Sequence, residues 1–344
     1  MTQGGGGITR ATTYLITGGA GFIGSHLTDA LLARGDNVIV LDQLSTGRHQ
    51  NLDAVQAHPG FRFVQGSVLD ELIVDEVVSE ADVVVHLAAA VGVKLLLDQP
   101  LSCLTHNIRG TEVVIDAAHR YDRKILIAST SEIYGKNGGG PLSEDSDRVL
   151  GPPTKARWAY STAKAVNEIM AYAYHREKGL ASIVVRFFNT VGPRQSPSYG
   201  MVIPRIVRQA VAGEPVTVYG DGAQSRCFCH VRDVVRALTS LLDEPAAVGD
   251  VFNIGGEQEM SILGLANRVK ELAGSDSQVT LVPYDQAYGA GFDDMRKRVP
   301  DTTKLRTLIG WAPVHTLDDI LTETIAEARA ERAQELTLSG EHPG

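Results

Sequence analysis

Tyr160 and Lys164 lie four residues apart in the segment WAYSTAK (158–164), and they are the first candidates for chemistry. Four residues is about one helical turn, so the phenol and the ammonium would share one helix face. A free phenol has a pKa of about 10, and a neighbouring ammonium would favour its ionised form. The spacing predicts either an acid–base pair or an ordinary surface pair, and the rest of the chain must decide.

A glycine-rich loop, TGGAGFIG (17–24), precedes this pair near the start of the chain. Gly18, Gly21 and Gly24 have the spacing G-x-x-G-x-x-G between an apolar run and a helical stretch. Glycines permit a tight turn and let the backbone approach a pyrophosphate, while the helix start offers unpaired N–H groups. The loop predicts a dinucleotide site; a strand–helix turn without a ligand is the alternative.

Asp42 ends the apolar run VIVLD, 18 residues after Gly24. An acidic side chain at this place can accept hydrogen bonds from both ribose hydroxyls and would repel a 2′-phosphate. We therefore predict NAD rather than NADP as the cofactor, with a simple turn residue as the alternative.

The surrounding chain alternates short apolar runs with helical stretches, which is typical of a parallel sheet covered by helices on both faces. The expected fold is α/β, a Rossmann-type doubly wound parallel sheet with a smaller C-terminal α/β substrate lobe. We assign 11–185 to the NAD-binding domain and 186–332 to the lobe, some of whose segments could return to the sheet; 1–10 and 333–344 are expected to be flexible tails. The principal strands are expected at 12–19, 37–42, 61–68, 82–89 and 124–130, and helices at 21–35, 107–122, 201–212, 231–243, 261–273 and 316–332.

Composition excludes several classes of protein. Of the 344 residues, 43% are hydrophobic and 21% charged, and the net charge of −9 argues against nucleic acid as a partner. Cys103, Cys227 and Cys229 cannot form a disulfide framework and lack zinc spacing, so we expect reduced thiols, no metal and a cytoplasmic location. A signal peptide and a membrane-spanning apolar run are not expected.

Three segments together resemble the extended short-chain dehydrogenase/reductase family, specifically its nucleotide-sugar epimerases, dehydratases and decarboxylases. These segments are TGGAGFIG, ASTSEIYG (128–135) and YSTAK (160–164), and the likeness covers about residues 12–330. The resemblance implies that Tyr160 is the acid–base group, and that Lys164 lowers its pKa and binds the nicotinamide ribose. It thereby favours the acid–base interpretation of the opening pair, and it implies a homodimer by analogy.

The resemblance also implies the remaining site residues. Thr130 would bond the reacting hydroxyl, Ser131 and Glu132 would join it as catalytic groups, and Arg226 would bind a diphosphate. Arg298 matches an arginine of uronate-processing relatives, with a solvated charge as the alternative. The substrate-binding set is Thr130, Ser131, Asn189, Thr190, Arg194, Val218, Tyr219, Arg226 and Arg298, with core packing as the alternative for Tyr219. The cofactor-binding set is Gly18, Gly21, Phe22, Ile23, Gly24, Asp42, Ser45, Gly47, Ser67, Val68, Leu87, Ala88, Ala89, Asn107, Ser129, Tyr160, Lys164 and Phe187.

The reaction follows from smaller differences within the family. Thr130-Ser131-Glu132 replaces the T-D-E of dehydratases, which disfavours dehydration, and Ser196 stands where glucuronate epimerases often carry a second arginine. The favoured substrate is UDP-glucuronate, epimerised at C4 to UDP-galacturonate, with Ser131, Thr190 and Arg194 restraining its carboxylate. UDP-glucuronate decarboxylase is the alternative, supported by Glu132 and by R-x-P-D at Arg298. UDP-glucose 4-epimerase is a second alternative, and a non-catalytic NAD-binding sensor is the alternative of another class.

Overall fold

A computed structural model describes residues 10–92, 98–138, 140–196, 201–288 and 295–339 of the chain. Its largest element is a seven-stranded parallel sheet with the order β3-β2-β1-β4-β5-β6-β11. The order reverses between β1 and β4, which is the point where doubly wound sheets bind ligands. The strands are β1 (Thr13–Thr17), β2 (Asn37–Asp42), β3 (Phe61–Gln65), β4 (Val83–His86), β5 (Lys124–Thr130), β6 (Ser182–Phe187) and β11 (Val251–Ile254).

Helices cover both faces of this sheet, as the apolar strands require. One face packs into a core with α1 (Phe22–Ala33) and α7 (Val231–Asp243), and the other with α2 (Glu71–Glu80), α4 (Pro100–Arg120) and α5 (Ala159–Lys178). The predicted Rossmann-type fold is confirmed. Both α7 and β11 follow residue 186 in the chain and still return to the sheet.

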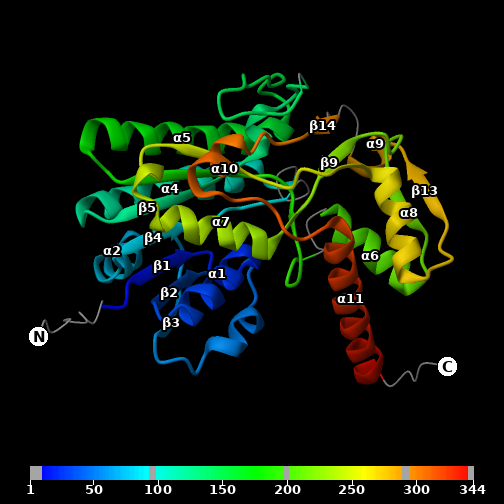
Figure 1. Cartoon of the computed structure of the whole chain (residues 1–344), viewed down its shortest axis with the longest axis horizontal. Helices are drawn as coiled ribbons and strands as arrows, with labels where there is room; N and C mark the ends of the chain where they lie inside the picture. The colour runs from blue at the N-terminus through cyan, green and yellow to red at the C-terminus, as the bar shows by residue number, and fades with distance from the viewer. Residues whose placement is uncertain (1–9, 93–97, 139, 197–200, 289–294, 340–344) are drawn as a thin grey trace, which may run out of the picture.

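The second lobe lies at one end of the sheet (Figure 1). Its apolar core joins α6 (Val202–Ala212), α8 (Ile262–Ala273) and α11 (Leu317–Ser339) to β8 (Val216–Tyr219). α11 continues to Ser339, so the expected tail at 333–344 is helical through 339, and 1–9 and 340–344 lie outside the described residues. The smaller elements are β7 (Thr190–Val191), β9 (Ser225–Cys227), β10 (Cys229–His230), β12 (Glu259–Ser261), β13 (Val279–Val282), β14 (Lys297–Arg298), α9 (Tyr284–Tyr288), α10 (Thr303–Ile309), η1 (His49–Val55), η2 (Ser131–Tyr134), η3 (Ala156–Trp158) and η4 (Pro245–Ala247).

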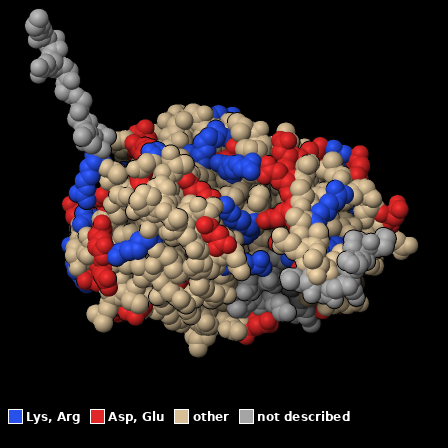
Figure 2. Space-filling model, turned by 90° about the horizontal axis from the view of Figure 1, so that it is seen from below, with Lys and Arg blue, Asp and Glu red and all other residues tan. Residues whose placement is uncertain are grey.

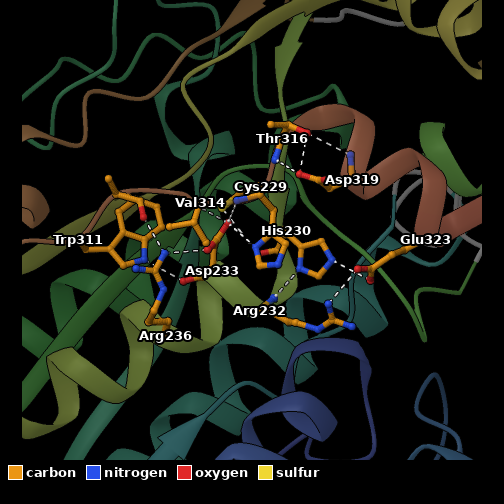
Figure 3. Close-up of polar contacts among 12 residues, drawn as sticks. Cys229, His230, Arg232, Asp233, Arg236, Trp311, Val314, Thr316, Asp319 and Glu323 are labelled. Carbon is orange, nitrogen blue, oxygen red and sulfur yellow. Dashed lines mark hydrogen bonds and ion pairs between the residues drawn. The ribbon is translucent and has the colours of Figure 1, made fainter.

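A buried carboxylate at the start of α7 anchors the segment that leads into α11 (Figure 3). Asp233 accepts hydrogen bonds from the backbone N–H groups of Val314 and His315 at 3.1 and 3.0 Å and from the His315 ring at 3.0 Å. Burial alone would raise the pKa of Asp233, but these hydrogen bonds and a further one from Arg236 hold it below its ordinary value. His230 stacks on His315 and bonds Glu323 of α11 at 3.2 Å, so one polar cluster joins the lobe to the sheet domain.

The charges on the surface are mixed in sign, and the cysteines are buried. Figure 2 shows acidic and basic side chains interspersed on the face drawn, without a continuous basic field there. Cys103, Cys227 and Cys229 are all buried free thiols. Within the described part of the chain, no helix combines the length and apolar character that crossing a membrane requires.

Candidate active site

A cavity of about 650 Å³ opens at the carboxyl ends of five strands of the large sheet. Gly18, Asp42, Leu87, Thr130 and Phe187 line it, and each ends or directly follows one of the strands β1, β2, β4, β5 and β6. Residues of the second lobe close its other side. The cavity therefore occupies the crevice at the switch point of the sheet, where this fold binds its ligands.

The glycine loop packs so tightly that side chains would not fit. Gly18 has a φ of +73°, and a Cβ added to it would lie 2.8 Å from the Ala88 backbone nitrogen. A Cβ on Gly24 would lie 2.4 Å from the Gly18 carbonyl oxygen. Gly21 caps α1 without a side-chain hydrogen bond, and the first turn of α1 holds no acidic residue. The amides at the start of α1 thus fit the pyrophosphate of a dinucleotide.

Asp42 presents a fixed carboxylate at the end of β2. Its oxygens accept hydrogen bonds from the backbone N–H groups of Ala20 at 3.0 Å and Leu44 at 2.8 Å. Burial raises the pKa of Asp42, and these two hydrogen bonds oppose that rise. Gly47 passes close behind, since a Cβ there would meet Asp42 Oδ2 at 2.9 Å. The carboxylate lines the cavity where a ribose acceptor is expected.

Tyr160 and Lys164 both line the cavity from the first two turns of α5. Lys164 is 1% exposed, and its Nζ donates to the Ala128 carbonyl oxygen at 2.9 Å. Burial lowers the pKa of Lys164 to about 8, while the charge of Glu168 acts to raise it. Lys164 is buried, Tyr160 is partly buried, and both line the cavity, so an ordinary surface pair is excluded, while the acid–base role stays a prediction.

The groups that act on the Tyr160 phenol do not support the predicted lowering of its pKa by Lys164. Burial first, and the carboxylate of Glu132 second, raise the pKa of Tyr160 above its ordinary value. The charge of Arg298 opposes them. Ionisation of the phenol therefore depends on further positive charge close to it, such as that of NAD⁺.

The segment after β5 divides its side chains between the cavity and the interior. Thr130 lines the cavity, and its Oγ1 accepts from the backbone N–H of Glu132 at 3.2 Å, which begins η2. Glu132 also lines the cavity. Ser131 is fully buried and lies outside the lining, so its expected contact with substrate lacks support. Ser129 lines the cavity, but its hydroxyl donates to Glu168.

Two arginines hold the Glu132 carboxylate inside the cavity. Arg157 contacts both oxygens, at 2.5 and 3.2 Å, and is 5% exposed. Arg298 reaches one oxygen at 3.3 Å. Burial would raise the pKa of Glu132, but the charges of Arg157 and then Arg298 bring it down to about 2. The sequence analysis missed Arg157, although it lies one turn before Tyr160 on η3, the turn that enters α5.

The second lobe supplies a cationic side to the same cavity. Arg226 on β9 and Arg298 on β14 are partners in register, and both line the cavity. Asn189 lines it too and accepts from Arg298 Nη2 at 2.8 Å. Arg194 also lines the cavity but forms an ion pair with Asp29 of α1 at 2.8 Å. The predicted diphosphate and sugar residues are thus gathered in one place, with Arg194 already engaged by an acid.

Most of the other expected residues line the cavity, and a few support it from behind. Tyr219 lines it, with the guanidinium of Arg205 stacked 4.1 Å from its ring centre, and Arg205 is a second lining residue that the sequence analysis missed. Asn107 is buried outside the lining and bonds the backbone of Ala90 in the loop after β4. Also within the lining are Phe22, Ile23, Ser45, Val68, Ala88, Ala89 and Thr190, whereas Gly47, Ser67 and Val218 lie outside it.

Comparison with known proteins places the chain in a family. The profile described as the NAD-dependent epimerase/dehydratase family matches residues 14–255, which is more than half of the chain. The chain belongs to the NAD-dependent epimerase/dehydratase family. It is an enzyme of this family, and NAD is its cofactor: the glycine loop, Asp42 and Lys164 would hold the dinucleotide.

Two relatives and one solved structure of the family are similar to this chain over most of its length. The chain is 39% identical over 312 residues to a UDP-N-acetyl-alpha-D-glucosaminuronate decarboxylase of Bacillus cytotoxicus, covering 90% of this chain and 96% of the relative. It is 37% identical over 317 residues to UDP-glucuronic acid decarboxylase 1 of Xenopus tropicalis, covering 92% and 72%. The UDP-glucuronic acid 4-epimerase of Bacillus cereus, solved with UDP-glucuronic acid and NAD, superposes with a TM-score of 0.84 at 27% identity, covering 93% and 99%.

Proposed function

We propose that this enzyme decarboxylates a UDP-linked hexuronate through a transient 4-keto sugar. The expectation of a UDP-glucuronate 4-epimerase is not confirmed. The two relatives above are both decarboxylases of UDP-linked uronates, and the first is covered over 96% of its length. Their names support the decarboxylase alternative more strongly than the epimerase.

The observation that carries the proposal is Glu132 held between Arg157 and Arg298 inside the cavity. Arg157 grips both carboxylate oxygens, whereas Arg298 makes one longer contact at 3.3 Å. A uronate carboxylate could replace Glu132 on Arg298 while Arg157 keeps Glu132 neutralised. Together with Arg226, the cavity then offers cations for both the sugar carboxylate and the diphosphate of the substrate.

The contacts of the expected carboxylate restraints give the epimerase little support. A 4-epimerase must keep the C5–carboxylate bond out of overlap with the ketone, or the ketone will lose CO₂. Ser131, Thr190 and Arg194 were the candidate restraints. Ser131 lies outside the cavity lining, and Arg194 is paired with Asp29. Thr190 alone of the three faces the cavity without an acidic partner among the described residues.

The chain's own groups can carry the reaction as follows. Thr130 orients the C4 hydroxyl by hydrogen bonding, and Tyr160 takes its proton as phenolate. When bound, NAD⁺ would accept the hydride from C4. The resulting ketone is β to the C6 carboxylate, so the C5–C6 bond can break: C6 leaves as CO₂ and the bonding electron pair moves into the ketone as an enolate. Protonation at C5 then gives the 4-ketopentose, and return of the hydride to C4 would give the pentose. Tyr160, now protonated, stabilises the enolate oxygen by donating a hydrogen bond.

Proton NMR of the product tests the proposal directly. The protein is incubated with NAD⁺ and either UDP-glucuronate or its 2-acetamido-2-deoxy analogue, and UDP-glucose serves as a third substrate. We expect a UDP-pentose or 4-ketopentose from one of the two uronates. A galacto-configured hexuronate would reinstate the 4-epimerase, and exchange of UDP-glucose with UDP-galactose would indicate the neutral-hexose epimerase. NAD binding without turnover of any of the three would favour the sensor.

The remaining parts of the proposal concern the location and the oligomeric state of the enzyme. We propose a cytoplasmic homodimer that contacts its partner through α4 and α5, by analogy with the family. Leu101, Ile169 and Tyr172 support this interface, because these helices expose them by 76%, 63% and 55%. Light scattering of the protein with Ile169→Glu would give a monomer, and an unchanged dimer would place the interface elsewhere.

A further inference from the structure

A buried ion pair lies one turn beyond Lys164 on α5, and the proposed reaction does not use it. Glu168 of α5 and Arg186 of β6 have side chains exposed by only 13% and 9%. Arg186 Nε and Nη2 donate to the two oxygens of Glu168 at 3.0 and 2.7 Å. Glu168 follows Lys164 by four residues, so the two side chains lie on the same face of the helix.

Further hydrogen bonds lock this pair in place. Ser129, at the end of β5, donates its hydroxyl proton to Glu168 Oε1. The free end of Arg186, Nη1, donates to the Tyr134 hydroxyl at 2.8 Å and to the Glu144 carbonyl oxygen at 2.7 Å. The carboxylate of Glu168 therefore receives three donors from two strands, and its negative charge is held at a fixed place beneath the cavity floor.

The same short stretch of β5 connects Glu168 to Lys164. Lys164 Nζ donates to the carbonyl oxygen of Ala128, and the next residue, Ser129, donates to Glu168. The ammonium and the carboxylate are thus attached to neighbouring residues of one strand. Burial lowers the pKa of Lys164 to about 8, and Glu168 is the charge that raises it against this burial. A pKa so near neutrality leaves the charge of Lys164 sensitive to the loss of one anion.

The other titratable groups around Lys164 do not supply a negative charge that could replace that of Glu168. His86 on β4 is fully buried between Thr17 and Thr111, and burial first and the Lys164 charge second lower its pKa to about 3, so it is neutral. Glu132 of η2 and Cys103 of α4 act on the Tyr160 phenol. The positive charge of Arg186 is compensated by Glu168 itself.

We propose that Glu168 is a positioning residue that acts through Lys164: fixed by Arg186 and Ser129, it keeps the Lys164 ammonium charged in the cavity that Tyr160 also lines. This inference rests on the acid–base role proposed for Tyr160 and Lys164. It does not depend on whether the ketone is then decarboxylated or reduced. Ser129, Glu168 and Arg186 thereby belong to the proton chemistry of the site, although Glu168 and Arg186 do not line the cavity.

The pH profile of C4 oxidation tests this proposal. Stopped-flow absorbance of NADH formation at saturating UDP-sugar is recorded from pH 6 to 10 for the wild type, Glu168→Gln and Tyr134→Phe. Glu168→Gln keeps the shape but removes the charge, so we expect its alkaline limb to shift down by one pH unit or more. The rate should fall about tenfold at pH 8 and less than threefold at pH 6. Tyr134→Phe removes a hydrogen bond of the same network without changing its charge, and its alkaline limb should stay in place.

Several outcomes would overturn the proposal. An unchanged alkaline limb in Glu168→Gln, or an equal shift in Tyr134→Phe, would make the network merely structural. If Glu168→Gln does not fold, Glu168→Asp is the second variant, because it keeps the charge on a shorter side chain. Its alkaline limb should stay at the wild-type pH. A rate that falls equally at every pH in Glu168→Asp would refute the charge argument. The affinity of the wild type and the variants for NAD⁺, measured at pH 7 and 9, gives the same comparison without turnover. Failure of the proposed decarboxylation can therefore be distinguished from failure of this inference.

Discussion

Replacing Arg157 by glutamine tests whether its buried ion pair with Glu132 stabilises the folded protein. The side chains of Arg157 and Glu132 are exposed by only 5% and 17%, and both carboxylate oxygens are contacted. The pKa of Glu132 lies at about 2, against an ordinary value of 4.5. At about 1.4 kcal/mol per unit, this shift corresponds to roughly 3 kcal/mol of stability at neutral pH.

Arg157 is the largest of the charges that lower this pKa, so most of that stability should disappear with it. We expect Arg157→Gln to lower the free energy of unfolding by about 2–3 kcal/mol at pH 7, measured by urea unfolding. The sign follows from a depressed carboxyl pKa: the stabilisation is present above about pH 4.5 and is lost as the pH falls towards 2. The difference between wild type and variant should therefore narrow over that acid window.

Arg208→Gln is the matched control. Arg208 pairs with Glu331 at 2.6 Å, but their side chains are exposed by 45% and 38%, and such pairs contribute less than about 1 kcal/mol. A loss in Arg157→Gln no larger than in this control, or a difference that persists unchanged down to pH 3, would refute the reasoning that Arg157 holds Glu132 ionised.

Three further predictions concern activity and binding. Tyr160→Phe should lower the turnover number about 10³-fold and leave NAD⁺ affinity within about threefold, measured by steady-state kinetics and fluorescence titration; retained turnover would exclude Tyr160 as the acid–base group. Asp42→Ala should weaken NAD⁺ binding about tenfold or more and reduce the preference over NADP⁺, measured by calorimetry, since it removes a ribose acceptor and an anion. Arg298→Gln should raise the KM for the uronate about 10–100-fold without changing the KM for a neutral UDP-sugar; an equal rise for both would assign Arg298 to the diphosphate.

Much of the fold could be predicted because its signals are local. The expected helix at 231–243 coincides with α7, and those expected at 201–212 and 261–273 begin within one residue of α6 and α8. The helix expected at 107–122 begins earlier, because Pro100 starts α4 and the six residues 101–106 continue it. The glycine loop and the Tyr160–Lys164 spacing were informative for the same reason, since each motif lies within one turn or loop.

The side-chain partners in the site could not be predicted, because they join segments that are distant in sequence. Arg157 and Glu132 are 25 residues apart, and Arg298 and Glu132 are 166 apart. Ser131 and Glu132 are neighbours, yet the η2 turn buries the first and leaves the second in the cavity. Arg194 has a left-handed φ of +68°, and its ion pair with Asp29 depends on how the lobe meets α1. Such contacts follow from the assembled fold.

The measurement that tests the central claim most directly follows the fate of the sugar carboxylate. UDP-glucuronate and its 2-acetamido analogue, each labelled with ¹³C at C6, are incubated with the enzyme and NAD⁺ while ¹³C NMR is recorded. The account predicts that one of them loses its carboxylate signal and that labelled bicarbonate appears at the same rate, with Tyr160→Phe lowering both rates together. A carboxylate signal that persists while the anomeric signal changes to the galacto configuration would contradict it.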